Sequence, residues 1–513
     1  MNLSESVNVT GTPRIAVDVG GTTRYATYTS GTGTNALTFT LAPQAGDVDL
    51  DGVTVSSPIQ LNGGTIKDSK GNDATLTFTP PNTANVKVNY PSLGMDFVYD
   101  ADGRYTLNGT PYNDLSSFLT AAGGSFTRAS IGTYYNSTGT LQTATANTPR
   151  FDYAPGTHTA KGILIEESRK NSLRNSTMQG VVAGTPGTLP TYWGPGGSGI
   201  GTLTQQIIGT GTENGMTYVD IRISGTTSTA TYLLYMDNTA YIAATSGQVW
   251  TSSVYSKLVA GTTNNVSMRF DIYERNSGGS SIINSQTALS TTGTLTRTTL
   301  TRTLNNASTA YVIADIGFYF TVGQPVDITI RIAAPQLEQG AFPTSFIPTT
   351  NASLTRTIES LTIPTGGWFD SGNGTVFTQA SLPYLGGTAY PGIMGLDDGS
   401  SNNAIEFLIN DATNDYTSTN YYVGGTFIGS AASTSAYTAN SILKMAAAYK
   451  NNDSRGSING NIGSQLNSIT IPAFSTFRIG ARRGNSAPLN GWISKVKYYP
   501  SRVPDTQLQS LTQ

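Results

Sequence analysis

Hydrophobic and polar residues alternate along this chain in short runs with a period of two residues. In residues 36–41 and 74–79, apolar side chains occupy one set of alternate positions and threonine occupies the other. Successive side chains of a β-strand point to opposite faces, and the β-branched threonine suits a half-exposed sheet surface. Glycine, asparagine, aspartate and proline separate these runs, as turns between strands require. The pattern therefore predicts an all-β fold.

Helical patterns are few and short. Residues 112–119 fit two helical turns with Asn113 or Asp114 as the N-cap, and residues 505–511 fit a closing helix just after Pro504. Neither segment is long enough to organise a domain. We therefore expect several β-sandwich domains in a row, with minimal helix.

Changes in composition mark the expected domain boundaries. Prolines end a first strand-rich region near residue 90, a basic stretch ends a second near residue 174, and a proline-flanked run ends a third near residue 348. A loop rich in glycine and proline follows the basic stretch. The expected domains cover residues 1–90, 91–185, 186–350 and 351–513.

The composition excludes several classes of function. Of the 513 residues only 12% are charged, about half of the roughly 25% that is usual for soluble chains. The formal net charge of -2 argues against nucleic-acid binding, which needs concentrated Lys and Arg. The chain has no cysteine and one histidine, which excludes thiolate metal sites and His-rich ones. A β-rich structural or sugar-binding protein fits this composition better than a typical enzyme does.

Neither a secretory nor a membrane segment can be recognised in the sequence. Residues 1–5 lack the basic and apolar regions of a signal peptide. No apolar run reaches the roughly 18 residues that a membrane-spanning helix needs. We therefore expect synthesis in a cytoplasm and no membrane insertion.

The N-terminal region carries strings found in a known domain type: residues 6–13, 18–22, 25–28, 45–52 and 61–65. These strings resemble the Ig-like repeats of large bacterial surface adhesins, which implies an Ig-like anchoring domain over residues 1–90. Such repeats usually begin one or two strands earlier than this sequence does. An exposed N-terminal edge strand is therefore expected to pair with a partner subunit.

Alternate aspartates follow one another at Asp47, Asp49 and Asp51. On an extended segment their carboxylates point the same way, as an oxygen-ligated Ca²⁺ requires. Pro58 stands where an EF-hand loop would need its Glu, so an EF-hand is excluded. The alternative is a polar turn at Asp51–Gly52. No other metal or cofactor is expected.

The most distinctive strings lie within residues 125–180: they are 126–128, 148–153, 162–167 and 169–171. They closely resemble a module of tailed-bacteriophage virion proteins, particularly fibres, where it usually precedes carbohydrate-binding-like jelly rolls. The resemblance implies a phage-fibre linker module over residues 91–185 and a fibre or spike component.

The charged residues of this module do not suggest catalysis. Glu166 and Glu167 lie on opposite faces of an extended segment, so they cannot cooperate as an acid/base pair. A structural salt bridge from Glu166 to Arg150 or Arg169 is expected instead. The lone His158 lies in a turn, away from any recognisable nucleophile motif.

Alternating runs also fill residues 186–350 and predict a jelly roll. The closing segment, 334–348, resembles the end of carbohydrate-binding modules in phage tail proteins. The candidate sugar-stacking residues are aromatic: Tyr192, Trp193, Trp250, Tyr255 and Tyr273. The alternative is that these rings fill the core of the sandwich.

Residues 366–513 resemble a concanavalin/laminin-G-like sandwich. The strings that carry the resemblance are 374–380, 443–449, 477–482 and 489–499. Many such domains bind glycans, and relatives sometimes hold Ca²⁺ in the loop that here contains Asp397 and Asn402. These two residues are therefore candidates for glycan binding, with a solvated loop as the alternative.

Together these resemblances imply a structural, non-enzymatic fibre of a tailed phage, on its tail or its head. We expect a homotrimer whose N-terminal domain binds other virion proteins and whose later domains attach to host cell-surface polysaccharide. It would be made in the host cytoplasm and reach the virion surface, with neither nucleic acid nor membrane as a partner.

Two alternatives remain open at this point. A polysaccharide depolymerase tailspike needs a pair of carboxylates, of which Glu338, Glu359 or Glu406 would supply one. Depolymerases generally resemble long β-helices with stacked repeats, which the sequence lacks. A bacterial surface adhesin fits the Ig-like strings, but the missing secretory segment and the phage-like module count against it.

Overall fold

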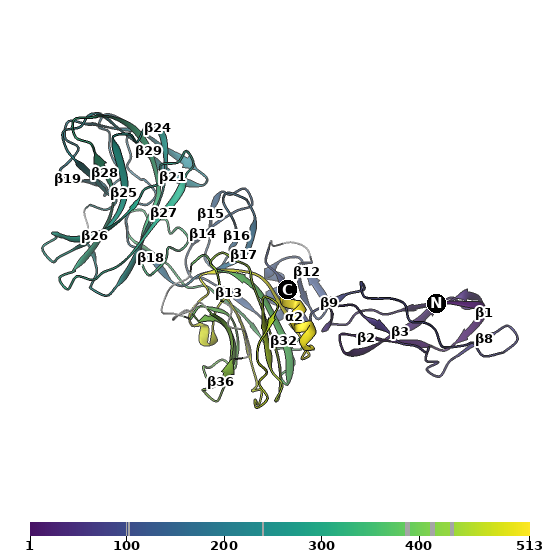
Figure 1. Cartoon of the computed structure of the whole chain (residues 1–513). Coiled ribbons are helices and arrows are strands. Elements are labelled where there is room, and N and C mark those ends of the chain that lie inside the picture. Colours follow the sequence, from purple (N-terminus) through teal and green to yellow (C-terminus); the bar gives the residue numbers. More distant parts are fainter. Residues whose placement is uncertain (99, 101–102, 239–240, 385–389, 411–415, 431–435) are drawn as a thin grey trace. The chain divides into compact units, whose positions relative to one another are not determined.

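The computed structural model describes residues 1–98, 100, 103–238, 241–384, 390–410, 416–430 and 436–513 (Figure 1). Antiparallel strands make up nearly all of its regular secondary structure, and the two α-helices in the described part, α1 (Leu115–Ala122) and α2 (Asp505–Thr512), are short. The predicted all-β fold class is therefore confirmed. None of the described helices has the length and apolar character needed to cross a membrane.

The chain forms two compact units. Unit 1 contains Met1–Ser125, Lys161–Ile163 and Ser360–Gln513, and unit 2 contains Phe126–Ala160 and Leu164–Glu359. Unit 1 therefore combines segments that lie far apart in the sequence, whereas unit 2 is interrupted only at residues 161–163.

The N-terminal part of unit 1 is a small sandwich of two antiparallel sheets (Figure 1). Their orders are β4-β1-β8 and β5-β3-β2-β7. The strands are β1 (Asn2–Thr10), β2 (Arg14–Val19), β3 (Thr22–Ser30), β4 (Thr34–Ala36), β5 (Thr38–Thr40), β7 (Thr54–Val55) and β8 (Thr65–Asp68). Alternate residues such as Val7, Ile15 and Ile66 meet in its core.

The expectation of an exposed N-terminal edge strand is wrong. Strand β1 is the central strand of its sheet, because it pairs with β4 on one side and with β8 on the other. The chain thus covers both edges of its own first strand.

The remainder of unit 1 is a larger sandwich. One sheet follows the order β12-β11-β10-β41-β32-β37-β38-β39, and the other contains β31-β40-β33-β34-β35-β36. The first set is β10 (Leu93–Asp96), β11 (Tyr105–Leu107), β12 (Thr110–Tyr112), β32 (Asn373–Ser381), β37 (Leu443–Lys450), β38 (Arg455–Ile458), β39 (Asn461–Ile462) and β41 (Gly491–Tyr499). The second is β31 (Ser360–Pro364), β33 (Gly392–Asp397), β34 (Ala404–Asn410), β35 (Tyr416–Val423), β36 (Thr426–Ser430) and β40 (Thr476–Ile479).

Both predicted helices form, and their local chemistry explains their ends. Asp114 caps α1 by accepting a hydrogen bond from the backbone of Ser117, and Gly123 ends the helix in the left-handed conformation that glycine adopts without strain. Helix α2 begins after Pro504 and buries Leu508 and Leu511.

Unit 2 contains a sandwich of two sheets, with the orders β20-β21-β29-β24-β27 and β19-β22-β28-β25-β26. The strands of the first sheet are β20 (Thr204–Glu213), β21 (Met216–Thr226), β24 (Val249–Gly261), β27 (Thr296–Thr303) and β29 (Pro325–Gln339). Those of the second are β19 (Gly194–Gly197), β22 (Thr231–Tyr235), β25 (Val266–Arg275), β26 (Ser281–Ala288) and β28 (Tyr311–Phe320).

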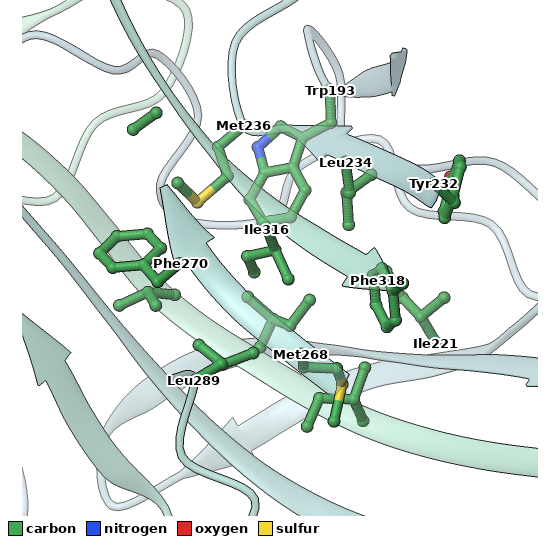
Figure 2. Packing of buried hydrophobic residues seen from close by; sticks show 14 of the residues in the cluster. Trp193, Ile221, Tyr232, Leu234, Met236, Met268, Phe270, Leu289, Ile316 and Phe318 are labelled. Atoms are coloured by element: carbon green, nitrogen blue, oxygen red, sulfur yellow. The ribbon is translucent and has the colours of Figure 1, made fainter. Parts of the chain in front are cut away.

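Alternate residues of these strands form the core of the sandwich. Figure 2 shows Met268 and Phe270 of β25 beside Ile316 and Phe318 of β28, with Ile221 of β21 packed in the same cluster. All of these side chains are buried. Because successive residues alternate across a strand, the intervening residues of β25 and β28 lie on the outer face of their sheet.

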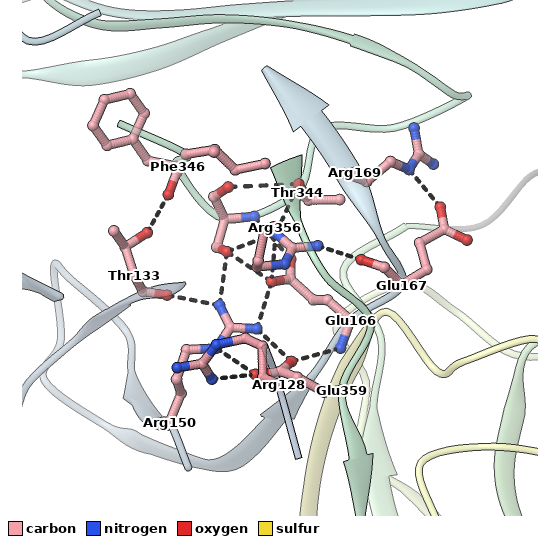
Figure 3. A network of polar contacts seen from close by, with 12 residues as sticks. Arg128, Thr133, Arg150, Glu166, Glu167, Arg169, Thr344, Phe346, Arg356 and Glu359 are labelled. Atoms are coloured by element: carbon pink, nitrogen blue, oxygen red, sulfur yellow. Dashed lines mark hydrogen bonds and ion pairs between the residues drawn. The ribbon is translucent and has the colours of Figure 1, made fainter. Parts of the chain in front are cut away.

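Unit 2 contains a network of buried charges, to which residues 126–180 contribute Arg128, Arg150 and Glu166 (Figure 3). Glu359 binds the guanidiniums of Arg128 and Arg150 at 2.8 Å each. Arg150 also reaches Glu166 at 2.8 Å, and Arg356 lies 3.0 Å from the same carboxylate. The predicted Arg150–Glu166 salt bridge is confirmed, whereas Arg169 pairs with Glu167 instead.

The network is nearly dry and its charges are matched. Arg128, Arg150 and Glu359 are fully buried, and the pKa of Glu166 falls to about 2 because Arg356 and Arg150 outweigh the effect of burial. Buried Glu338 supplies a further negative charge near Arg356. Buried charges that are paired in this way favour one arrangement of the chain, although Arg356 Nε lacks a partner among the described residues.

Replacing Arg150 by alanine will leave Glu166 and Glu359 short of a buried partner. We expect the free energy of unfolding of unit 2 to fall by about 3–5 kcal/mol, as for other broken buried ion pairs. Denaturant titration measures the change. Arg222→Ala, which removes an exposed pair with Asp327, is the control and should have little effect. Equal effects of the two substitutions would contradict a stabilising role for the network.

Candidate functional site

Two of the aromatic residues predicted to bind glycans lie in the core of unit 2. Trp193 is 7% exposed and Trp250 4% exposed, and both belong to the central cluster, in which Figure 2 shows Trp193. The indole of Trp250 donates to the side chain of Gln248 at 3.0 Å. Both rings therefore fill the core of the sandwich, which was the alternative to sugar stacking.

Two other aromatic candidates are held by neighbouring side chains. The hydroxyl of Tyr255 lies 2.8 Å from that of Tyr135. The guanidinium of Arg174 lies 3.9 Å from the centre of the Tyr192 ring. Tyr255 lies in β24 of the first sheet, whereas Tyr273 lies in β25 of the second.

The aspartates weighed as a calcium site have protein partners of their own. Asp47 accepts a hydrogen bond from Arg24 at 2.9 Å, and Asp49 accepts one from the backbone of Gly20 at 2.7 Å. Asp51 accepts a hydrogen bond from Gln507. Across the described ranges, no cluster of three or more Asp, Glu or His side chains has the arrangement to hold a metal ion.

The acidic residues of unit 1 that were candidates for glycan binding or catalysis also have partners inside the protein. Asp397 is fully buried and pairs with Arg478, and Asn402 is an exposed residue of a turn. Glu406, weighed for a depolymerase, is buried between Arg482 and Arg483.

The carboxylates of unit 2 that were considered for a depolymerase also have partners inside the protein. Glu359 belongs to the arginine network, and Glu338 accepts a hydrogen bond from the backbone of Thr344 at 3.0 Å. Both are fully buried.

Tyr273 stands on a different surface, the outer face of the second sheet of unit 2. We call this surface the tyrosine face. Its members come from β22, β25, β26 and β28 and from the chain just after β22: they are Tyr235, Tyr241, Arg269, Asp271, Tyr273, Arg275, Gln286, Tyr311, Asp315 and Tyr319. The strand register places Gln286, Asp271, Asp315 and Tyr235 in one row across the sheet. Directly opposed residues of antiparallel strands share a face.

Glycines let the tyrosine rings lie flat against the sheet. A Cβ atom at Gly196 would overlap the ring of Tyr235, and one at Gly317 would lie 2.6 Å from the ring of Tyr319. Glycine inside a strand permits such close approach. The result is a surface of tyrosine rings, of which Tyr241 is half exposed and stacks near Tyr311 at 5.0 Å between ring centres.

An aspartate pair lies in the middle of this face. Asp271 and Asp315 are cross-strand neighbours, and both are fully buried. Tyr319 donates to Asp271 Oδ2 at 3.3 Å. Apart from a proton that the two carboxyls share, no donor of the described part of the chain reaches Asp271 Oδ1 or either oxygen of Asp315. Buried carboxylates normally accept several hydrogen bonds, so this pair is unusual.

The surroundings of the pair favour a retained proton. Burial raises the pKa of Asp271 to about 6, against the lowering influence of Tyr319, Asp315, Arg269 and Gln286. Burial and the charge of Asp271 raise the pKa of Asp315 well above its usual range, and Arg275 opposes this rise. Two carboxyls in contact cannot both ionise without repulsion.

Arg275 complements the pair with an unused donor. It is 9% exposed, and its guanidinium lies 5.1 Å from the ring centre of Tyr235 and 5.5 Å from that of Tyr241. Its Nε–H is buried and has no acceptor among the described residues. The tyrosine face thus combines rings, unsatisfied acceptors and an unsatisfied donor.

Sequence reasoning found only Tyr273 of this face. The alternation in β25 was visible, but the residues that meet it come from β22 and β28, and only the strand register brings them together. The sequence signature that would have pointed to the face is Asp315-Ile316-Gly317-Phe318-Tyr319, where glycine interrupts a strand between polar positions.

No family model matches this chain, and no curated protein matches it. Solved structures resemble it weakly. Domain 4 of the extracellular GH43 arabinanase AbnA from Geobacillus stearothermophilus, in complex with arabinotriose, is 14% identical, with a TM-score of 0.26, over 34% of this chain and 82% of that chain. The tripod from the baseplate of bacteriophage Tuc2009 is 12% identical, with a TM-score of 0.26, over 69% and 97%.

A third solved structure is the CBM22 tandem domain of Xyn10C from Paenibacillus barcinonensis. It is 10% identical, with a TM-score of 0.20, over 62% of this chain and 98% of that chain. With TM-scores this low, none of the three likenesses carries an argument about fold or function.

The aspartate pair makes the stability of unit 2 depend on pH. In the unfolded chain both groups titrate near 4, so the folded state binds their protons more tightly. The free energy of unfolding will therefore fall as the pH rises from about 4 through 6, the pKa of Asp271. Asp315→Asn removes one charge and places an amide donor beside Asp271. At pH 8 it should raise the free energy of unfolding by about 2 kcal/mol.

Denaturant titration of both proteins from pH 4 to pH 8 measures this effect. Asp327→Asn, an exposed aspartate of the other sheet, is the matched control and should leave the pH profile unchanged. An Asp315→Asn protein that keeps the wild-type profile would show that the pair does not share a proton.

Proposed function

We propose that this protein is a structural, non-enzymatic fibre component of a tailed phage that attaches to host cell-surface glycan through the tyrosine face. The observation that carries the glycan role is the face itself, where flat tyrosine rings surround buried charged groups that lack partners. The phage role is supported by the strings within residues 125–180, which resemble a virion-protein module.

The chemistry of the face suits a sugar ring. Aromatic rings supply apolar area that packs against the C–H face of a pyranose, while Tyr hydroxyls at their edges remain hydrogen-bonding groups. Asp271, Asp315 and Arg275 supply convergent polar groups that fix the orientation of a ligand. Both requirements of glycan recognition are thus met by one sheet.

The proposal includes the setting in which such a face works. A single surface site of this kind binds weakly, and a homotrimer on the virion surface would raise its effective concentration. The N-terminal sandwich of unit 1 would attach to other virion proteins. Its first strand is already paired on both sides, so that attachment would use other surfaces.

One observation favours the depolymerase alternative, the raised pKa values of Asp271 and Asp315. A glycosidase uses one carboxyl as an acid and keeps the second about 5 Å or more away. Asp271 and Asp315 instead lie in hydrogen-bonding contact with each other. This spacing supports binding rather than hydrolysis.

Removing the exposed ring of Tyr241 or the half-buried ring of Tyr319 will weaken glycan binding. We expect Tyr241→Ala and Tyr319→Ala each to lower the affinity roughly tenfold, since each removes stacking area at the surface. A glycan array identifies the ligand, and calorimetry with that ligand measures the affinity. Tyr25→Ala, an exposed tyrosine of the N-terminal sandwich, is the control. An intact protein with no ligand on the array would refute glycan attachment.

Incubation with host polysaccharide tests the absence of catalysis. We expect no sustained release of reducing sugar, because Asp271 and Asp315 are in contact with each other. A reducing-sugar assay over several hours provides the measurement. Steady product release that Asp271→Asn abolishes would establish the depolymerase instead.

A further inference from the structure

The groups of the tyrosine face that lack partners define what a ligand must offer. Apart from the hydrogen bond that the two aspartates share through their retained proton, no described group donates to Asp271 Oδ1 or to the oxygens of Asp315, and none accepts from Arg275 Nε–H. Burying such groups without hydrogen bonds is costly, so a ligand that supplies the missing partners gains binding energy.

We propose that the tyrosine face selects uncharged, hydroxyl-bearing glycans over acidic and amino glycans, an inference that rests on the proposed function. A sugar hydroxyl both donates and accepts, so a run of hydroxyls can satisfy the aspartate pair and Arg275 together. A glycan carboxylate could pair with Arg275 or Arg269 but not with the aspartates, and an ammonium could pair only with the aspartates.

Charge repulsion adds to the discrimination. An acidic sugar would bring a further negative charge beside Asp271 and Asp315, and like charges in a poorly solvated site repel strongly. An ammonium would meet Arg269 and Arg275, which stand on the same strand at either side of the pair. An uncharged ligand avoids both penalties.

Access to the pair is controlled by Tyr319. Its hydroxyl donates to Asp271 at 3.3 Å and accepts from Gln286 at 2.7 Å, and Gln286 in turn accepts from Arg269 at 2.6 Å. Arg269 and Gln286 are exposed and Tyr319 is half-buried, so the covering side chains lie at the surface. Rotation of Tyr319 would let a ligand hydroxyl take the place of its own hydroxyl on Asp271, and such side-chain changes are common on binding.

A glycan array with neutral, uronate- or sialate-containing, and amino glycans tests the inference on the full chain. Wild-type protein should favour neutral glycans at least tenfold. Asp315→Asn and Asp271→Asn should each weaken the best neutral ligand roughly tenfold and narrow its advantage over the acidic counterpart. Asp327→Asn makes the same chemical change at an exposed position of the other sheet and should alter neither value.

The outcomes separate this inference from the function on which it rests. Binding that is lost in Tyr241→Ala but keeps its selectivity in both aspartate variants would overturn the inference and leave glycan attachment standing. A wild-type preference for acidic or amino glycans would do the same. No binding by wild-type protein would overturn both. Thermal unfolding confirms that each variant is folded. If one of Asp271→Asn and Asp315→Asn fails to fold, the other still provides the test.

Discussion

The arrangement of unit 2 depends on the ion pairs made by the fully buried guanidinium of Arg150. It binds Glu166 from its own module and Glu359 from a segment 209 residues away in the sequence. A guanidinium can bind two carboxylates at once because its donors form a planar fork. Loop closure on this scale costs entropy, and matched buried charges compensate by allowing only one arrangement of the segments. In a chain that is 12% charged, this concentration of charge in one place is notable.

The same unit holds a second group of buried charges with the opposite property. Around Arg150 the charged groups find their counterparts inside the protein, whereas Asp271 and Asp315 face each other without sufficient donors. A satisfied polar network stabilises a fold, and an unsatisfied one stores free energy that a binding partner can release. This contrast is the physical reason for proposing that the second group binds a ligand, whereas the first stabilises the fold.

Sequence reasoning succeeded where local rules decide the outcome. The period of two residues gave the fold class, Asp114 was recognisable as an N-cap, and the Arg150–Glu166 bridge follows from charges in one module. It could not find Glu359 or the row formed by Asp271, Asp315 and Tyr235, because strand register and long-range packing bring these residues together. Trp193 and Trp250 show a further limit, since composition does not tell a core ring from a surface ring.

In the tyrosine face, the residues that form the exposed surface differ from the residues that support it. A side chain at Gly196 or Gly317 would displace the ring of Tyr235 or Tyr319, and the buried side chains beneath them fill the core. Tyr241, Arg269 and Gln286 project from that sheet, and their replacement leaves its core intact. If the face binds a ligand as proposed, single substitutions can therefore change which ligand it accepts, while the scaffold beneath keeps its shape and its stability.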